Sequence, residues 1–312
     1  MGLRLNSEEN LAEKATKSKS KQNNNLVAYA FLSPWIIGFI LFSGFPILVS
    51  FFLSLTEWNL LGDIKFIGLK NYIEMFMTGS RFWNTLKVTL IYVIFGVLAS
   101  VIWSLFLAVL LNMKVKGIGI FEFIFFIPAV TPIVALVFSF QLMLHDQLGI
   151  VNYILSIMGI DGPNWLNSTT WAMPVVIFIT LFTYSTGQMM LIFSAALKDV
   201  PKELYEACDI DGAGFFKKFF NVTLPSISPI LLFNLVISCV NILNGSFSLI
   251  YPLTNGGPNG ATNVLSLDIY NNAFKLFRMG YASALSVVLF AIIAIFSIVQ
   301  FKLSSKWVYY EN

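Results

Sequence analysis

Two groups of neutral polar side chains interrupt long apolar stretches, and their chemistry suits contact with a hydroxyl-rich solute. Hydroxyls and amides both donate and accept hydrogen bonds. The alternative, which the sequence leaves open, is that they bond one helix to another, as buried serine and asparagine do in membranes. Helical spacing places residues 184 and 188 on one face, and residues 241, 244 and 248 on another. The first group is Tyr184, Ser185 and Gln188, and the second is Asn241, Asn244, Ser246 and Ser248.

A charged loop over residues 198–221 separates two apolar stretches and forms the second candidate site. It cannot lie in hydrocarbon, where charge and unpaired backbone are too costly. Pro201 and Glu203 are typical of a first helical turn, and Asp211-Gly212 indicates a turn before a second short helix from Ala213 to about Phe220. We therefore expect a helix–turn–helix that presents a surface to a partner.

The residue types of this loop suit a docking surface with a rigid apolar anchor and a polar rim. The small side chains of Ala207, Cys208 and Ala213 allow close approach. Phe215 and Phe216 are large enough to fill a pocket in the partner.

Composition assigns the chain to the helical membrane proteins. It has 312 residues, of which 57% are hydrophobic and 11% charged, whereas soluble domains carry about 25% charged residues. The strands of a β-barrel would alternate instead of forming unbroken apolar runs. The net charge of +3 and the scattered basic residues exclude nucleic-acid binding.

Metal and disulfide chemistry are not expected. No cluster of cysteine and histidine has metal-ligand spacing. The single histidine, His145, lies at the end of an apolar stretch and is interpreted as interfacial. Cys208 lies in the polar loop and Cys239 in an apolar run, so we expect two free thiols at different depths.

Apolar runs of roughly 20 residues or more are long enough to cross a bilayer. We expect Pro34 and Pro46 to interrupt the first run, and Pro128 and Pro132 the third. The six predicted spans are residues 27–55, 84–112, 118–144, 171–197, 222–250 and 281–301.

Lysine and arginine are concentrated in both terminal segments, in the connection between the second and third spans, and in the 198–221 loop. The positive-inside rule then places these segments in the cytoplasm. Residues 1–25 are polar and lysine-rich, which predicts a disordered tail. We expect a transmembrane domain over residues 26–303 and a short cytoplasmic tail over 304–312.

No predicted span has an ionisable residue near its centre, which argues against proton or ion coupling inside the lipid. The spans lack paired carboxylates or a nucleophile–base pair, so no catalytic residue is assigned. The chain also lacks the Gly-Lys-Ser/Thr ending of a phosphate-binding loop. Active transport would need energy from another subunit. The alternative is a stand-alone facilitator or channel.

The segment from Glu206 to Ala213, followed by Leu224-Pro225, resembles the EAA loop of binding-protein-dependent ABC importer permeases. Cys208 stands where the usual pattern has alanine. Residues 66–72, 253–258 and 280–286 resemble the MalF/UgpA-like carbohydrate branch. The resemblance covers residues 26–303 and implies an all-α membrane protein with six spans of the type I importer fold and a cytoplasmic coupling loop.

The resemblance implies that this loop enters a cleft of a cytoplasmic ATPase. Glu206 would pair with a basic group there, Gly212 would permit the turn, and Leu224-Pro225 would join the loop to the fifth span. The implied partners are two ATPase copies, which bind the ATP and magnesium, a second MalG/UgpE-like permease in a heterodimer, and an extracellular solute-binding protein. The chain itself would hold no cofactor. The implied coupling residues are Tyr205, Glu206, Ala207, Cys208, Asp211, Gly212, Ala213, Phe215, Leu224 and Pro225.

The resemblance also implies a solute path on the spans flanking the loop, in a bacterial cytoplasmic membrane. It favours the polar residues introduced above, although Leu243 stands where the maltose permease has an amide. No cationic side chain lies mid-membrane, which disfavours a phosphorylated solute. We expect a neutral or weakly acidic sugar or oligosaccharide, with its identity open. The implied path residues are Tyr184, Ser185, Gln188, Asn241, Asn244 and Ser246.

Overall fold

A computed structural model describes residues 29, 31–78, 80–113 and 116–309, arranged as two compact units, residues 1–53 and 54–312. The predicted tail over residues 1–25 lies outside the described residues. In the first unit an apolar helix runs over Phe31–Leu53. Its middle is a π-helical turn, η1 (Ile40–Gly44), which leads into α2 (Phe45–Leu53). The helix therefore passes through Pro46 on a widened turn rather than breaking there.

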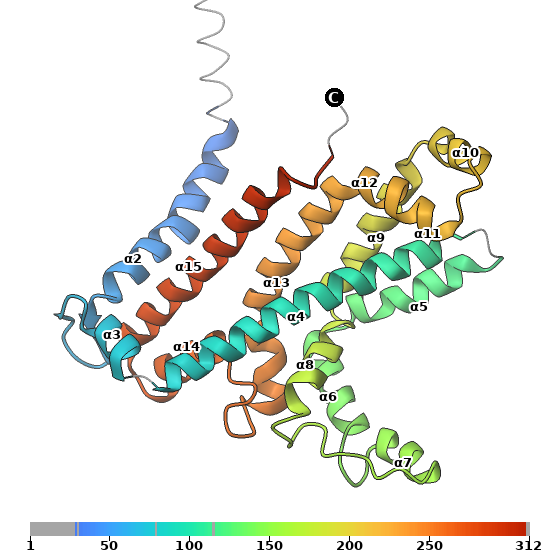
Figure 1. Ribbon diagram of the computed structural model, residues 1–312. Helices are drawn as coiled ribbons and strands as arrows, with labels where there is room; N and C mark the ends of the chain where they lie inside the picture. Colours follow the sequence, from blue (N-terminus) through green and yellow to red (C-terminus); the bar gives the residue numbers. More distant parts are fainter. Residues whose placement is uncertain (1–28, 30, 79, 114–115, 310–312) are drawn as a thin grey trace, which may run out of the picture. The chain divides into compact units, whose positions relative to one another are not determined.

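The described part of the second unit is helical apart from one antiparallel pair of two-residue strands. Helices α4, α9, α13 and α15 form most of it, and Figure 1 shows α10 and α11 at one end of α9 and α7 at the opposite end of the unit. Its elements are β1 (Thr56–Glu57), β2 (Lys65–Phe66), α3 (Lys70–Ile73), η2 (Glu74–Thr78), α4 (Ser80–Leu111), α5 (Ile118–Val130), α6 (Ile133–Met143), α7 (Ile150–Ile157), α8 (Ala172–Thr180), α9 (Tyr184–Asp199), α10 (Lys202–Ile210), α11 (Phe215–Lys218), η3 (Phe219–Thr223), α12 (Leu224–Ser226), α13 (Ser228–Thr254), α14 (Leu265–Tyr270), η4 (Asn271–Lys275) and α15 (Met279–Ser304).

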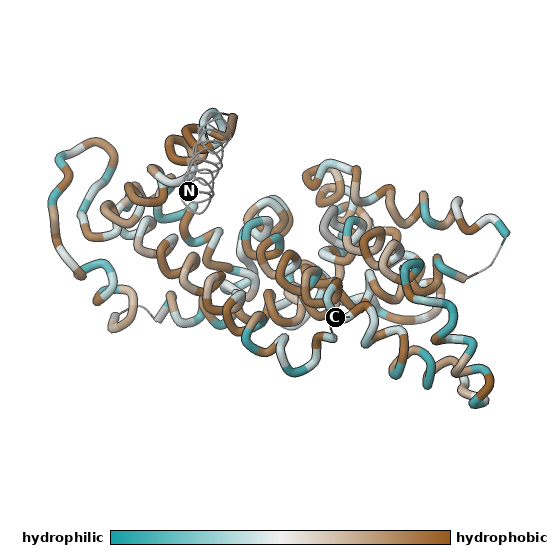
Figure 2. The backbone as a smooth tube through the Cα atoms, turned by 90° about the horizontal axis from the view of Figure 1, so that it is seen from above, coloured by the Kyte–Doolittle hydropathy of each residue, from teal (hydrophilic) through white to brown (hydrophobic). Residues whose placement is uncertain are grey.

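Four continuous helices of the described chain are long and apolar enough to cross a membrane: Phe31–Leu53, Arg81–Leu111, Ser228–Thr254 and Met279–Ser304. Figure 2 shows hydrophobic residues along the long helices and hydrophilic residues gathered in the segments that connect them. The chain is therefore a multi-pass membrane protein.

The third predicted span is a pair of helices, α5 and α6, that meet at 102°. Pro132 causes the break, because it lacks an N–H and forces the preceding residue out of the helical region. Thr131 accordingly has φ −80° and ψ 132°. The prediction that Pro132 interrupts the third span is confirmed, and the interruption is a sharp bend, whereas Pro128 lies inside α5 without breaking it.

The fourth predicted span is also divided, into α8 and α9, although no proline marks the position. Here two threonine side chains take over the end of α8: the hydroxyls of Thr183 and Thr186 donate to the carbonyl of Thr180, at 2.8 and 3.2 Å. Such side-chain bonds offer the backbone an alternative to the helix ladder. The sequence analysis named interruptions only in the first and third spans, so the division of the fourth was not predicted.

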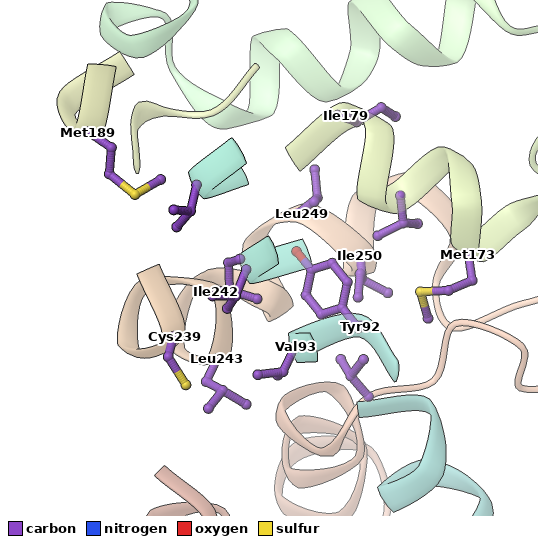
Figure 3. Close-up of a cluster of buried hydrophobic side chains, with 14 of the residues drawn as sticks. Tyr92, Val93, Met173, Ile179, Met189, Cys239, Ile242, Leu243, Leu249 and Ile250 are labelled. Atoms are coloured by element: carbon purple, nitrogen blue, oxygen red, sulfur yellow. The ribbon is translucent and has the colours of Figure 1, made fainter. Parts of the chain in front are cut away.

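The core of the second unit lies where α4 packs along α9 and α13. Tyr92 is buried there among Ile242, Leu249 and Ile250 (Figure 3). Gly187 on α9 lies so close to α5 that an added Cβ would overlap that of Ala129. Gly187 therefore allows close packing between α5, which precedes the first break, and α9, which follows the second.

Two of the segments that carry the family resemblance meet, although more than 200 residues separate them in the chain. Asn71 is buried and its side-chain amide donates to the carbonyls of Ser54 and Thr56, at 2.8 and 2.9 Å. Gly280, at the start of α15, packs against the same Thr56 carbonyl, which an added Cβ would overlap. The amide of Met279 donates to the carbonyl of Trp58 at 2.9 Å. These contacts hold the β1–α3 segment to α15.

Candidate solute cavity and docking loop

A cavity of about 420 Å³ lies where the break between α5 and α6 and the break between α8 and α9 face α13. None of its lining side chains carries a charge. The lining residues are Tyr92, Pro128, Thr131, Ile133, Leu136, Thr180, Thr183, Asn241, Ile242, Asn244, Gly245, Ser248 and Leu249.

The polar groups of the cavity come from the two breaks and from one face of α13. Asn241, Asn244 and Ser248 recur at helical spacing on α13. The hydroxyls of Tyr92 and Thr180 share a hydrogen bond of 3.1 Å across the cavity wall. Amides and hydroxyls that converge in an otherwise apolar cavity are typical of a site for a small polar molecule. The arrangement can bind hydroxyl groups without supplying charge.

The structure brings some of the predicted path residues together and leaves others out. Asn241 and Asn244 line the cavity. Ser246 does not: it is buried, and its hydroxyl lies 2.6 Å from that of Ser266 on α14. This contact fits the alternative interpretation, a bond between helices. Gln188 is half-buried on α9 and is not among the lining residues.

Tyr184 and Ser185 form the first turn of α9, immediately after the break. Their side chains lie outside the described residues, so their assignment to the path stays a prediction.

Sequence reasoning missed four polar lining residues: Tyr92, Thr131, Thr180 and Thr183. The proline pair around Thr131 could have indicated this residue, because a broken helix leaves polar backbone that must face a cavity or protein. Thr180 and Thr183 have no comparable signal, since their break is made by their own side chains. Tyr92 lies in an apolar run that is buried on several sides.

The charged loop forms the expected helix–turn–helix. Gly212 adopts the left-handed conformation, φ +66°, between α10 and α11. The amide of Ala213 donates to the carbonyl of Cys208 at 2.9 Å, which closes the end of α10. Lys218 on α11 forms an ion pair with Asp209 on α10 across the turn. These bonds give the loop a defined shape in water.

The outer surface of the loop is apolar as well as charged. Ile210 is 88% exposed and Phe216 is 74% exposed, and Phe215, Glu206 and Ala207 are also exposed. Large apolar side chains exposed together outside the spans indicate an interaction surface.

Other predicted loop residues face inward. Tyr205 is half-buried, and its hydroxyl shares a hydrogen bond of 2.9 Å with that of Thr223 in η3. Cys208 and Ala213 are half-buried, whereas Asp211 is exposed. Leu224 and Pro225 form α12, the short helix between the loop and α13. The predicted fifth span thus begins at Ser228 rather than at residue 222.

Residues 100–308 match the family model described as binding-protein-dependent transport system inner membrane component. The chain belongs to this family. It is therefore a permease, the membrane-embedded subunit of an ABC-type transport system, and its work is transport.

Two curated relatives match this permease over almost their whole length. It is 38% identical to the probable ABC transporter permease protein YesP of Bacillus subtilis (strain 168), over 97% of this chain and 98% of YesP. It is 32% identical to the trehalose/maltose transport system permease protein MalF of Thermococcus litoralis, over 91% of this chain and 96% of that protein.

A solved structure supports the fold. A chain of a bacterial ABC transporter involved in the import of the acidic polysaccharide alginate matches with a TM-score of 0.79, at 23% identity, over 92% of this permease and 98% of that chain. The expected type I importer permease fold is confirmed.

Proposed function

We propose that this permease passes neutral or weakly acidic oligosaccharides through the cavity between the two broken helices and α13. The observation that carries the proposal is the uncharged lining, in which amides and hydroxyls converge between apolar walls. Each of these groups can donate a hydrogen bond to a sugar hydroxyl or accept one from it. Relatives named as arabinooligosaccharide and trehalose/maltose permeases support the same class of cargo.

The cavity forms half of a path that a second, homologous permease completes. Asn244, Gly245 and Ser248 line the cavity and are exposed in the single chain. Polar groups in a membrane protein face a partner or a water-filled cavity rather than lipid. A second permease packed opposite α13 would shield them from lipid and supply the other wall.

The apolar surface of α10 and α11 docks on a cytoplasmic ATPase, of which the transporter has two copies. Phe215 and Phe216 provide the anchor, and Glu206 and Lys217 lie on the exposed polar rim. ATP and magnesium bind to the ATPase, which performs the hydrolysis. The loop transmits closure of the ATPase pair to the spans, so the cavity opens alternately to each side.

The docking loop and both termini lie in the cytoplasm, and the loops at the opposite ends of the spans face an extracellular solute-binding protein. Lys217 and Lys218 lie in the docking loop, Lys302 lies in the last turn of α15 and Lys306 just after it, as the positive-inside rule requires for cytoplasmic segments.

Reconstitution tests the proposal. The permease, its partner permease, the ATPase and candidate binding proteins are placed in liposomes and offered maltose and maltopentaose, arabinobiose and arabinopentaose, and alginate di- and pentasaccharide. Stimulated ATPase activity with uptake of one sugar–receptor pair is the expected result. Phe215→Ser with Phe216→Ser should abolish stimulation, whereas Asn221→Ala, at an exposed residue of η3 where the loop ends, should not. Uptake without ATP by this chain alone would overturn the proposal in favour of a facilitator.

A further inference from the structure

A second, larger cavity of about 630 Å³ lies beyond the first, at the end of the spans opposite the docking loop. We propose that it is an outer subsite for a neutral sugar residue of the same oligosaccharide, occupied before or together with the first cavity; this rests on the function proposed above. Its lining residues are Phe138, Gln141, Leu142, Leu144, His145, Asp146, Asn164, Trp165, Leu166, Asn167 and Leu253.

The two cavities follow one another along the same pair of helices. On α13, Leu249 lines the first cavity and Leu253 the second, which corresponds to a step of about 6 Å along the helix axis. On α6, Leu136 lines the first and Phe138 the second. An extended oligosaccharide that follows this seam would place successive residues in the two cavities.

The wall between α6 and α13 is a built structure rather than a loose groove. The side-chain amide of Gln141 on α6 donates to the carbonyls of Pro252 and Leu253 on α13, at 2.7 and 3.0 Å. These carbonyls lie at the end of α13, where the intrahelical partners run out. The bonds fix the two helices relative to each other at the place where the cavity opens.

The opposite wall offers an aromatic surface. The indole N–H of Trp165 donates to the side-chain oxygen of Asn152 at 2.7 Å, and its ring meets that of Trp171 edge-on at 5.4 Å. The polar edge of Trp165 is therefore used within the protein. The indole of Trp165 is fixed in place by these two contacts, and its apolar ring suits the apolar face of a sugar ring.

Free polar groups stand beside this ring. Asn164 and Asn167 line the cavity and are exposed, and their side chains make no hydrogen bond to any described part of the chain. Each amide has donors and an acceptor available for sugar hydroxyls. The backbone amides of Gln147 and Leu148 both donate to His145 Nδ1, each at 3.3 Å, which holds the ring and leaves Nε2 outside these bonds. The cavity has one acid and no lysine or arginine, so its chemistry favours a neutral sugar residue over an anionic one.

The test compares long and short sugars in the reconstituted transporter, with the same di- and pentasaccharide panel. Asn164→Ala with Asn167→Ala should raise the half-saturating concentration of the pentasaccharide roughly tenfold and leave that of the disaccharide unchanged. Thr169→Ala with Thr170→Ala is the matched control, because both residues are exposed in the same loop and neither lines the cavity.

The outcomes separate this inference from the function on which it rests. One outcome is that Asn244→Ala impairs uptake, while Asn164→Ala with Asn167→Ala leaves the half-saturating concentrations of both the disaccharide and the pentasaccharide at the wild-type values. That outcome overturns the outer subsite and leaves the proposed path through the first cavity in place. If the pair weakens assembly with the second permease instead, measured by co-purification, the cavity holds a loop of that subunit and the subsite is likewise overturned. If no panel member is taken up, both proposals fall together.

Discussion

The hydroxyl of Tyr205 on α10 lies 2.9 Å from the hydroxyl of Thr223 in η3. This hydrogen bond joins α10 of the docking loop to η3, which leads through α12 into α13. Tyr205 also packs against the core cluster that contains Ile227. A force on α10 therefore has a direct route, through one side chain, to the helix that lines the solute cavity.

Removing this hydroxyl should uncouple transport from ATP hydrolysis. Tyr205→Phe keeps the ring packing and loses one hydrogen bond, worth about 1 kcal/mol. We expect normal insertion and ATPase docking, with several-fold fewer sugars imported per ATP hydrolysed. The measurement is uptake and phosphate release in the same liposomes. Thr223→Val should behave alike, and the double variant should be no worse than either single one. Additive losses would show that the two residues act separately.

The turn at Gly212 gives a second prediction with an internal control. Gly212 and Gly214 lie in the same loop, and nothing stands within 4 Å of an added Cβ at either. Only Gly212 has positive φ, +66°. Gly212→Ala should destabilise the turn by about 1 kcal/mol and weaken ATPase binding, while Gly214→Ala should leave it intact. Titration of the ATPase onto liposomes measures both. Equal behaviour of the two variants would mean that the turn conformation does not matter for docking.

Gly280 should tolerate no side chain. A Cβ there would overlap the backbone carbonyl of Thr56, which cannot move without breaking its bond to Asn71. Gly280→Ala should therefore lower the melting temperature in detergent strongly, by an overpacking cost of about 1–3 kcal/mol. Gly119→Ala, on open space in α5, is the control. A stable Gly280→Ala protein would show that the contact between β1 and α15 gives way easily.

How far the sequence predicts this molecule depends on whether the cause of each feature is local. The docking helix–turn–helix was predictable because Pro201 and Asp211-Gly212 fix the ends and turn by their own chemistry. The bend at Pro132 was predictable for the same reason. The break after Thr180 was not predictable from the sequence. It is made by hydrogen bonds from threonine side chains to the backbone, and a threonine in a sequence does not by itself indicate that it forms such a bond.

The candidate path shows the same division. Helical spacing correctly grouped Asn241 and Asn244 on one face of α13, since that needs only the period of the helix. It could not decide between solute and neighbouring helix as the partner of Ser246, because that depends on Ser266, which packs there through tertiary structure. The roles of all these residues in transport remain predictions.

Those roles can be separated by one pair of variants on α13. Asn244 is exposed in the cavity, whereas Ser246 is buried and bonded to Ser266. Asn244→Ala should raise the half-saturating sugar concentration about fivefold with no change in melting temperature, as the loss of one hydrogen bond to a solute predicts. Ser246→Ala should lower stability by about 1 kcal/mol and leave the sugar dependence alone. The reverse pattern would place the solute on the α14 side of α13.

The buried carboxyl of Asp268 predicts a pH dependence of stability. Its side chain is 4% exposed and lies 3.2 Å from the guanidinium of Arg81, which is 65% exposed. Burial raises the pKa of Asp268 above its usual value, against the opposing attraction of Arg81 and a hydrogen bond with Asn263. The folded protein then binds more protons than the unfolded chain just above the ordinary aspartate range, so this residue makes stability fall as pH rises through its folded pKa.

Asp268→Asn should remove that dependence, because asparagine resembles the neutral acid. At neutral pH we expect the variant to melt at or above the temperature of the wild type, and the difference should shrink as pH falls through the folded pKa. Melting curves of both proteins in detergent across the acid range measure it, and the difference between them cancels the other carboxylates. Arg81→Gln is the opposing control: without its attraction the ionised carboxyl should cost more, so this variant should lose stability at neutral pH and recover it in acid. A variant Asp268→Asn that melts well below wild type at neutral pH would show that the ion pair outweighs the burial.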